Sequence, residues 1–389
     1  MRDVQDGPRR PQRRLWQTLA LLSGAVFLAW VARFYHPGVG FTSMLVIPRG
    51  HDYEIPALQR LPHFEYPAGV AYDGAMYVQL AMVPLLDDPA IDRALDAPSY
   101  RARRMLFCWT AWALGLGRPG WILQAYALQN VLSWLVLAWF TTRWLRPDHG
   151  RGFALWMAAM FGLGLLTSVR LALLDGPSLL LIACAAAAAE RGRSLATGAI
   201  VGLAGLGRET NLLGGLLLPW PRGRAGWLRT AAAAITVVLP LLIWMDYVRS
   251  IYWTASATAG AGQLTVPLSA YARKWSLVVQ GIRGDGLLSA HGLTLTTVVA
   301  LTVQAIFVAW SRMWSEPWWR IAAGYAVLMS LVDWAVWDGH PGAVTRVVLP
   351  LTFGFNVLLA KREPRWFWPW YAAGNLNLVA LVLLARDAL

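Results

Sequence analysis

The sequence predicts an all-α membrane protein that crosses the bilayer about eleven times. Of its 389 residues, 57% are hydrophobic and only 14% are charged, whereas soluble domains typically carry about 25% charged residues. Apolar runs of roughly 20 residues, long enough to cross ~30 Å of hydrocarbon, recur along the chain. The runs lack the alternation of a membrane β-barrel, so transmembrane helices are expected.

The net charge of +13 predicts the topology. Basic residues form short clusters between the apolar runs, which is typical of cytoplasmic loops under the positive-inside rule. No nucleic-acid partner is expected, because the clusters do not form one basic face. The two cysteines, Cys108 and Cys184, lie in separate hydrophobic segments, and neither a disulfide nor a metal cluster is expected.

The chain is expected to consist of a short basic N-terminus and one large transmembrane domain. Residues 1–14 form a basic cytoplasmic N-terminus, and residues 15–389 form a single transmembrane domain. The first span, 15–34, is expected to be an uncleaved signal anchor. The next membrane-length run is 121–144, so the intervening segment 35–120 is a long loop on the non-cytoplasmic side.

Further spans are expected because apolar runs alternate along the chain with turns, and the basic turns are assigned to the cytoplasmic side. Segment 195–220 is interrupted by Gly207-Arg-Glu-Thr210, and it is either a hairpin of two short helices or one kinked span. Segment 105–116 is too short to cross a membrane, so an amphipathic helix on the outer surface is expected. The remaining spans are expected at 153–174, 175–190, 230–245, 292–310, 321–337, 343–360 and 366–384.

The long loop carries the first candidate site residues. Asp73 lies at the start of a short helix, where it is either an N-cap or a general base. A second helix is expected to start near Pro98 and to present Arg101 and Arg104 on one face. The two arginines either bind phosphate oxygens or extend toward lipid head groups.

Two other segments are expected near the outer face. Asp175 is a plausible N-cap of the helix that it opens, with Pro177 in the first turn. His340 and Arg346 lie near the outer mouth of two spans. They either bind a donor phosphate or an acceptor, or belong to an ordinary capped turn with an arginine extended toward the head groups.

The order of these elements resembles the GT-C superfamily of integral membrane glycosyltransferases, which use polyprenyl-phosphate sugars. In layout the sequence is most similar to protein O-mannosyltransferases and lipid A aminoarabinose transferases. The resemblance covers about residues 15–219. Its motifs are Tyr-Asp-Gly-x-x-Tyr at 72–77, Pro-x-Tyr-Arg-x-x-Arg at 98–104, Leu-Leu-Asp-x-Pro at 173–177 and Arg-Glu-Thr at 208–210.

The resemblance implies roles for these residues. Asp73 matches the catalytic base, and Arg101 and Arg104 match basic residues that meet the donor phosphate. Many members have a second acidic residue next to the first, where this chain has a glycine, so neither a metal nor another cofactor is expected. The remaining expected substrate-binding residues are Tyr77, Asp175, Arg208, Glu209, His340 and Arg346.

The expected function is transfer of a sugar from a lipid-linked donor to an acceptor on the outer face of the bacterial cytoplasmic membrane. The acceptor is a glycan, a lipid or a protein, and membrane lipids are the other expected partners. Two alternatives stay open, a transporter or flippase of lipid-linked sugars and a non-catalytic scaffold subunit. The chain has no clear internal repeat of the kind that marks many transporters.

Overall fold

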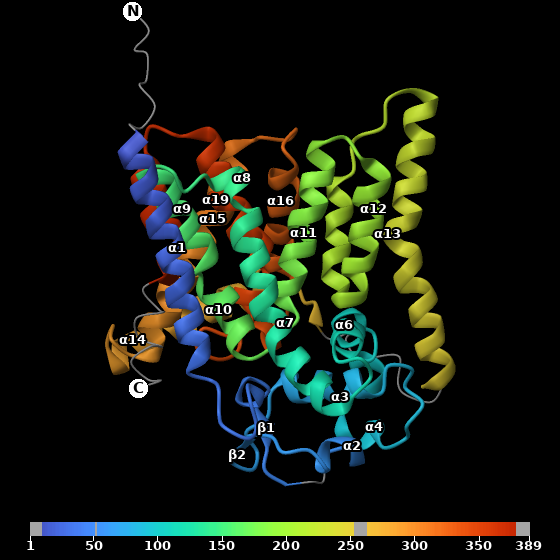
Figure 1. Ribbon diagram of the computed structural model, residues 1–389. Helices are drawn as coiled ribbons and strands as arrows, with labels where there is room; N and C mark the ends of the chain where they lie inside the picture. The colour runs from blue at the N-terminus through green and yellow to red at the C-terminus, as the bar shows by residue number, and fades with distance from the viewer. Residues whose placement is uncertain (1–9, 51–52, 253–262, 379–389) are drawn as a thin grey trace, which may run out of the picture.

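The computed structural model describes residues 10–50, 53–252 and 263–378. They form a bundle of helices with the segment between α1 and α7 gathered at one end (Figure 1). We call this the loop end, and the opposite end, where α1 begins, the N-terminal end. Most of the basic N-terminus and the last part of the expected span 366–384 lie outside the described residues.

The loop segment contains short elements only. Its two strands, of two residues each, pair in parallel. In chain order the elements are η1 (Thr42–Met44), β1 (Ile47–Pro48), α2 (Pro56–Gln59), β2 (Glu65–Tyr66), α3 (Asp73–Met82), α4 (Ile91–Ala94), α5 (Pro98–Arg101) and α6 (Leu106–Leu114).

The bundle is built from the remaining helices. They are α1 (Arg10–Ala32), α7 (Pro119–Phe140), α8 (Thr142–Leu145), α9 (Gly150–Met160), α10 (Leu163–Arg170), α11 (Asp175–Glu190), α12 (Ser194–Gly207), η3 (Glu209–Leu217), α13 (Gly223–Ile251), α14 (Ser269–Asp285), α15 (Ala290–Ser311), α16 (Pro317–Leu331), α17 (Trp334–Trp337), α18 (Val344–Val347), α19 (Leu349–Arg362) and α20 (Phe367–Gly374).

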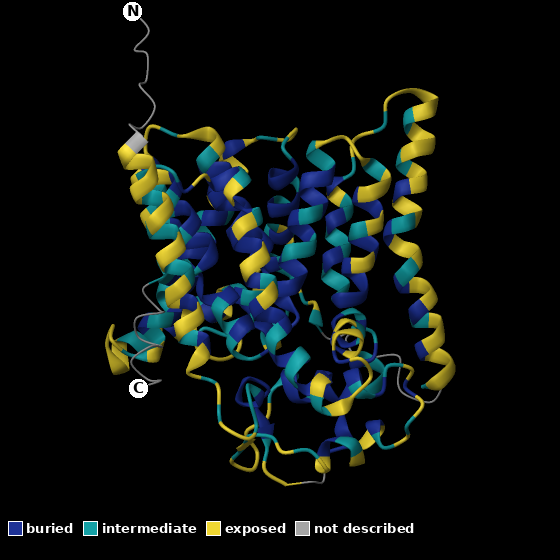
Figure 2. Cartoon of the chain, in the orientation of Figure 1, coloured by how far each residue is buried: buried dark blue, intermediate teal, exposed yellow. Residues whose placement is uncertain are grey.

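The chain is an all-α, membrane-embedded protein. Among the described residues, four helical segments are long and apolar enough to cross a bilayer, namely Pro11–Ala32, Pro119–Leu145, Gly223–Ile251 and Ala290–Ser311. The bent pair α9 and α10, at 43° to each other, is a fifth candidate. Exposed residues cover much of α1 and α13 at the edges of the bundle (Figure 2), where apolar side chains suit lipid contact.

Of two helices expected in the loop segment, one forms and the other ends early. Segment 105–116 forms α6, a helix of nine residues at the loop end that packs against α3 and α7. The expected helix from Pro98 through Arg104 is wrong, because α5 ends after one turn at Arg101. The carbonyl of Ala102 instead accepts a hydrogen bond of 2.7 Å from Trp244 Nε1 on α13, so a tertiary contact takes the place of the next helical turn.

Segment 195–220 consists of two short helices. Helix α12 ends at Gly207, the backbone of Arg208 is extended, and the 3-10 helix η3 then packs back against α12. Gly198 and Gly202 allow close packing of α12 on α13, because a Cβ at Gly202 would lie 2.1 Å from the Thr236 carbonyl oxygen. Small residues at this spacing are typical of membrane helix pairs.

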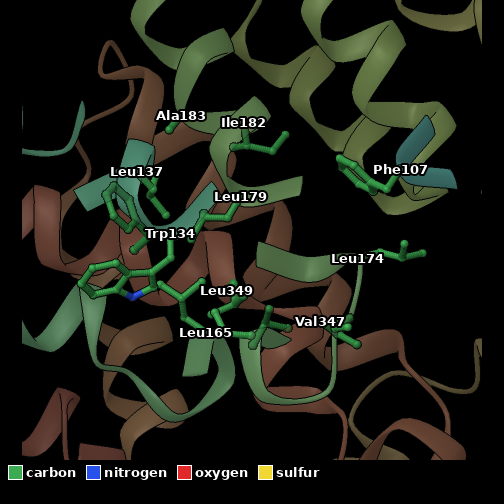
Figure 3. Packing of buried hydrophobic residues seen from close by; sticks show 14 of the residues in the cluster. Phe107, Trp134, Leu137, Leu165, Leu174, Leu179, Ile182, Ala183, Val347 and Leu349 are labelled. Carbon is green, nitrogen blue, oxygen red and sulfur yellow. The ribbon is translucent and has the colours of Figure 1, made fainter. Parts of the chain in front are cut away.

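The core positions the start of α11 between its neighbours. Trp134 and Leu137 of α7 pack near Leu179 of α11 in a continuous buried cluster (Figure 3). The Trp134 ring also stacks on Phe27 of α1 at 3.6 Å between centroids. This packing holds α1, α7 and α11 together and fixes the place of Asp175 at the loop end of α11.

Candidate functional site

All of the predicted site residues except His340 meet in one charged network at the loop end. They come from α3, the α5–α6 segment, α11, the break between α12 and η3, and α18. We call this the arginine–carboxylate network. Its members are Asp73, Tyr77, Asp96, Arg101, Arg104, Asp175, Arg208, Glu209 and Arg346.

Asp73 is the first residue of α3, and it is not an N-cap. The N-cap position belongs to Tyr72, and no side chain forms a capping hydrogen bond there. The Asp73 carboxylate instead accepts a hydrogen bond of 2.8 Å at Oδ1 from Arg101 Nη1. Its Oδ2 lies 3.8 Å from Arg346 Nη1 and accepts no hydrogen bond within the described residues. The side chain is 29% exposed, so Oδ2 is accessible to a small hydroxyl group.

Arg101 is shared between two carboxylates. Its Nε and Nη2 donate to both oxygens of Asp96 at 2.9 and 2.8 Å, while Nη1 binds Asp73. This paired geometry is the strong form of an arginine–carboxylate contact. Hydrogen bonds from Arg101 lower the pKa of Asp96 below its usual value. Arg101 is therefore a positioning group for Asp73, with both edges of its guanidinium already used.

Arg104 connects the loop to the broken hairpin. Its Nε donates to Glu209 Oε2 at 2.8 Å, and its other nitrogens donate to the hydroxyls of Tyr77, at 3.3 Å, and Tyr100. The guanidinium also lies 4.4 Å from the centroid of the Tyr100 ring. Burial raises the pKa of Tyr77, against the opposing effect of Arg104, so its phenol stays protonated at neutral pH.

Asp175 is the most buried acid of the network. It is not an N-cap, because Leu174 occupies that position and Asp175 is the first helical residue of α11. Its carboxylate pairs with Arg208, and Oδ2 lies 3.4 Å from Arg346 Nη1. Arg346 Nη2 also donates to the Tyr72 hydroxyl at 2.8 Å. A buried carboxylate of this kind is stable only when it is paired.

The position of Arg346 follows from tight backbone packing. Gly164 of α10 faces α18, where an added Cβ would lie 2.2 Å from the Thr345 carbonyl oxygen. Glycine thus allows α18 to approach α10, and this contact directs the next residue, Arg346, toward α3 and α11.

The network contains four arginines and four carboxylates, so its formal charges balance. Arg208 Nε and Glu209 Oε1 are buried and have no hydrogen-bond partner within the described residues. Buried polar atoms are normally satisfied. These two atoms therefore leave one donor and one acceptor unsatisfied at the hairpin break.

His340 lies apart from the network, although it lines a pocket that Arg346 of the network also lines. Its Nδ1 is 3.0 Å from Thr294 Oγ1, and its ring packs 4.7 Å from His291. The pocket has a volume of about 480 Å³, and Tyr72, His340 and Arg346 are among its lining residues. Its size is within the range of small-molecule sites.

Sequence reasoning missed three members of this region. Asp96 supplies two of the three contacts to Arg101, and the hydroxyls of Tyr72 and Tyr100 bind Arg346 and Arg104. Tyr72 and Tyr100 stand inside the two quoted loop motifs, next to Asp73 and Arg101, and that adjacency was the available signal. No sequence pattern distinguished Asp96 from the other acids of the loop.

The described residues contain no group of three or more His, Cys, Asp or Glu side chains arranged to hold a metal ion. The neighbours of Asp73 are arginines and not further oxygen ligands. No protein-family model matches the chain, and no curated protein or solved structure is detectably similar to it. Functional inference therefore rests on the geometry of the network.

Proposed function

We propose that the chain is a membrane glycosyltransferase similar to the GT-C superfamily, with the loop end on the outer face of a bacterial cytoplasmic membrane. It would cross the membrane about eleven times, with its N-terminus inside. The donor would be a polyprenyl-phosphate sugar, and the acceptor a glycan, lipid or protein. One observation carries the proposal: a partly exposed carboxylate, Asp73, lies next to an arginine, Arg346, that lines a pocket of small-molecule size.

Asp73 suits the role of general base. Arg101 holds Oδ1, which fixes the orientation of the carboxylate, while Oδ2 remains available to an acceptor hydroxyl. General base catalysis needs such a group within hydrogen-bond reach of the proton that it removes. The acceptor proton would pass to Oδ2 as the acceptor oxygen forms its bond to the sugar carbon and the donor phosphate leaves.

Arg346 is the best candidate for the cation that stabilises the leaving phosphate. Arg101 and Arg104 each bind a carboxylate at 2.8 Å, whereas Arg346 lies 3.4 and 3.8 Å from its two carboxylates. A phosphate oxygen would therefore displace the weakest ion pairs of the network at this position. An arginine directed at developing negative charge is a common source of transition-state stabilisation.

The test is an activity assay on purified, lipid-reconstituted protein with defined polyprenyl-phosphate sugars. Asp73→Asn should reduce turnover by about 10²–10⁴-fold, the usual contribution of a general base. The matched control is Asp87→Asn, which alters an exposed acid of the same loop that has no ion pair within the described residues. Its turnover should equal that of the wild-type protein.

A folded Asp73→Asn variant with full activity would refute the catalytic assignment. Wild-type protein that transfers no sugar but moves lipid-linked sugars across vesicle membranes would refute the transferase and support the flippase alternative. Folding of each variant is checked by its elution in size-exclusion chromatography and by its thermal unfolding midpoint.

A further inference from the structure

A second pocket lies at the N-terminal end, the end opposite the arginine–carboxylate network. It has a volume of about 280 Å³ and lies between the α8–α9 turn and the α19–α20 turn, near the labels α8 and α19 in Figure 1. We call it the basic pocket. Its charged or titratable lining residues are Arg143, Arg146, His149, Arg151, Lys361 and Glu363.

Positive charge is in excess in this pocket. Arg143 and Lys361 both bind Glu190, at 3.2 Å each, and Lys361 also pairs with Glu316. Arg146 and Arg151 are exposed, and neither forms an ion pair within the described residues. An anion entering the basic pocket would therefore find two arginines without carboxylate partners, in contrast to the balanced charges at the loop end.

The remaining walls of the basic pocket are apolar. Buried Leu155 and Phe367 line it together with Ala360. The Arg151 guanidinium lies 5.0 Å from the centroid of the Phe367 ring, so the charged and apolar surfaces adjoin. A ligand with both an anionic group and a hydrocarbon part fits this combination better than a free inorganic anion.

The position of the basic pocket along the bundle indicates the source of such a ligand. Three strongly exposed tryptophans lie close in sequence to its lining residues: Trp139, at 72%, near the end of α7 and four residues before Arg143, and Trp366 and Trp368, at 68% and 51%, on either side of Phe367. Exposed tryptophans gather at the level of the lipid head groups. The pocket therefore opens at the depth where lipid phosphates lie.

We propose that the basic pocket binds the phosphate head group of an anionic membrane lipid, with Arg146 and Arg151 contacting the phosphate and Phe367 contacting the start of an acyl chain. Basic pockets between membrane helices bind anionic lipids in this way. The site is separate from the proposed transferase site, so either proposal can fail without the other.

The probe is phosphatidylglycerol added to the full-length, detergent-solubilised protein, with binding followed by native mass spectrometry and by the thermal unfolding midpoint. Phosphatidylcholine and inorganic phosphate serve as comparison ligands. Phosphatidylglycerol should bind at least tenfold more tightly than either one. Equal binding of inorganic phosphate, or equal binding of phosphatidylcholine, would overturn the proposal.

The variant is Arg146→Asn combined with Arg151→Gln. Asparagine tolerates the left-handed backbone of residue 146, which has φ 35°. The double variant should lose at least tenfold in affinity for phosphatidylglycerol. The single variant Arg151→Gln, at an exposed position, should lose part of that affinity. It keeps the proposal testable if the double variant does not fold.

The matched control is Arg312→Asn. Arg312 is exposed, follows α15 with a left-handed φ of 48° and is not among the residues that line the basic pocket. Its loss should leave lipid affinity unchanged. An equal loss of affinity in Arg312→Asn and in the Arg146 and Arg151 variant would show that general positive charge, and not the pocket, attracts the lipid, and would overturn the proposal.

Discussion

Removal of the buried charge at Asp175 should strongly destabilise the protein. The Asp175 side chain is 3% exposed and contacts Arg208 and Arg346, which are 15% and 10% exposed. Asp175→Asn keeps the shape of the side chain but leaves two nearly buried guanidinium groups short of a counter-charge. Breaking one partner out of a buried ion pair typically costs about 3–5 kcal/mol.

The expected cost is somewhat below that range. Arg346 keeps Asp73 at 3.8 Å as a second carboxylate, and both arginines retain some access to solvent. We therefore expect Asp175→Asn to lower the free energy of unfolding by about 2–4 kcal/mol. The same change at the exposed acid Asp87 should cost less than about 0.5 kcal/mol.

The assay is reversible unfolding by sodium dodecyl sulfate in mixed micelles, followed by circular dichroism. A double-mutant cycle with Asp175→Asn and Arg208→Gln isolates the pair, and a coupling energy of about 1–3 kcal/mol is expected for contacting groups. The reasoning is refuted if Asp175→Asn costs no more than Asp87→Asn. A coupling energy near zero would likewise show that Arg208 and Asp175 do not act together.

Two more predictions follow from single positions. Gly202→Ala should lower the free energy of unfolding by about 1–3 kcal/mol, because the added Cβ meets the backbone of Thr236. Gly24→Ala, which meets no atom within 4 Å, should leave the free energy of unfolding unchanged or raise it by up to about 1 kcal/mol, because alanine is the better helix former. Equal effects of the two substitutions would contradict the packing argument. The lowered folded-state pKa of Asp96 contributes stability that is present above its unfolded-state pKa of about 3.9 and is lost as pH falls through the folded-state value. Asp96→Asn should therefore flatten the fall in unfolding midpoint between about pH 5 and pH 3, and an unchanged pH profile would argue against the Arg101 contact.

Features that depend on local sequence were predictable. Long apolar runs predicted the membrane-length helices at 119–145, 223–251 and 290–311, because a segment must be both long and apolar to lie in lipid. The shortness of the apolar run at 105–116 correctly excluded a span, since α6 has only nine residues. The total of eleven spans stays a prediction, because several bundle helices have 16 residues or fewer.

Features that depend on contacts between distant segments were not predictable. The helix expected from Pro98 stops early because Trp244, far along the chain, binds the carbonyl of Ala102. Asp73 and Asp175 occupy the first turn of their helices, as a capping pattern suggested, but their carboxylates face arginines and not backbone amides. A helix-start pattern gives the position of a carboxylate, and the tertiary fold decides its partner.

The hydrogen bond between Tyr72 and Arg346 joins residues 274 positions apart. At a synthesis rate of about 5–20 residues per second, the arginine would leave the ribosome roughly 14–55 s after the tyrosine. For most of that interval α3 is already made, and Asp73 and, once it has been synthesised, Asp175 lack Arg346. The loop end can therefore complete its ion pairs only after α18 has been synthesised, so assembly of this region comes late in the biogenesis of the protein.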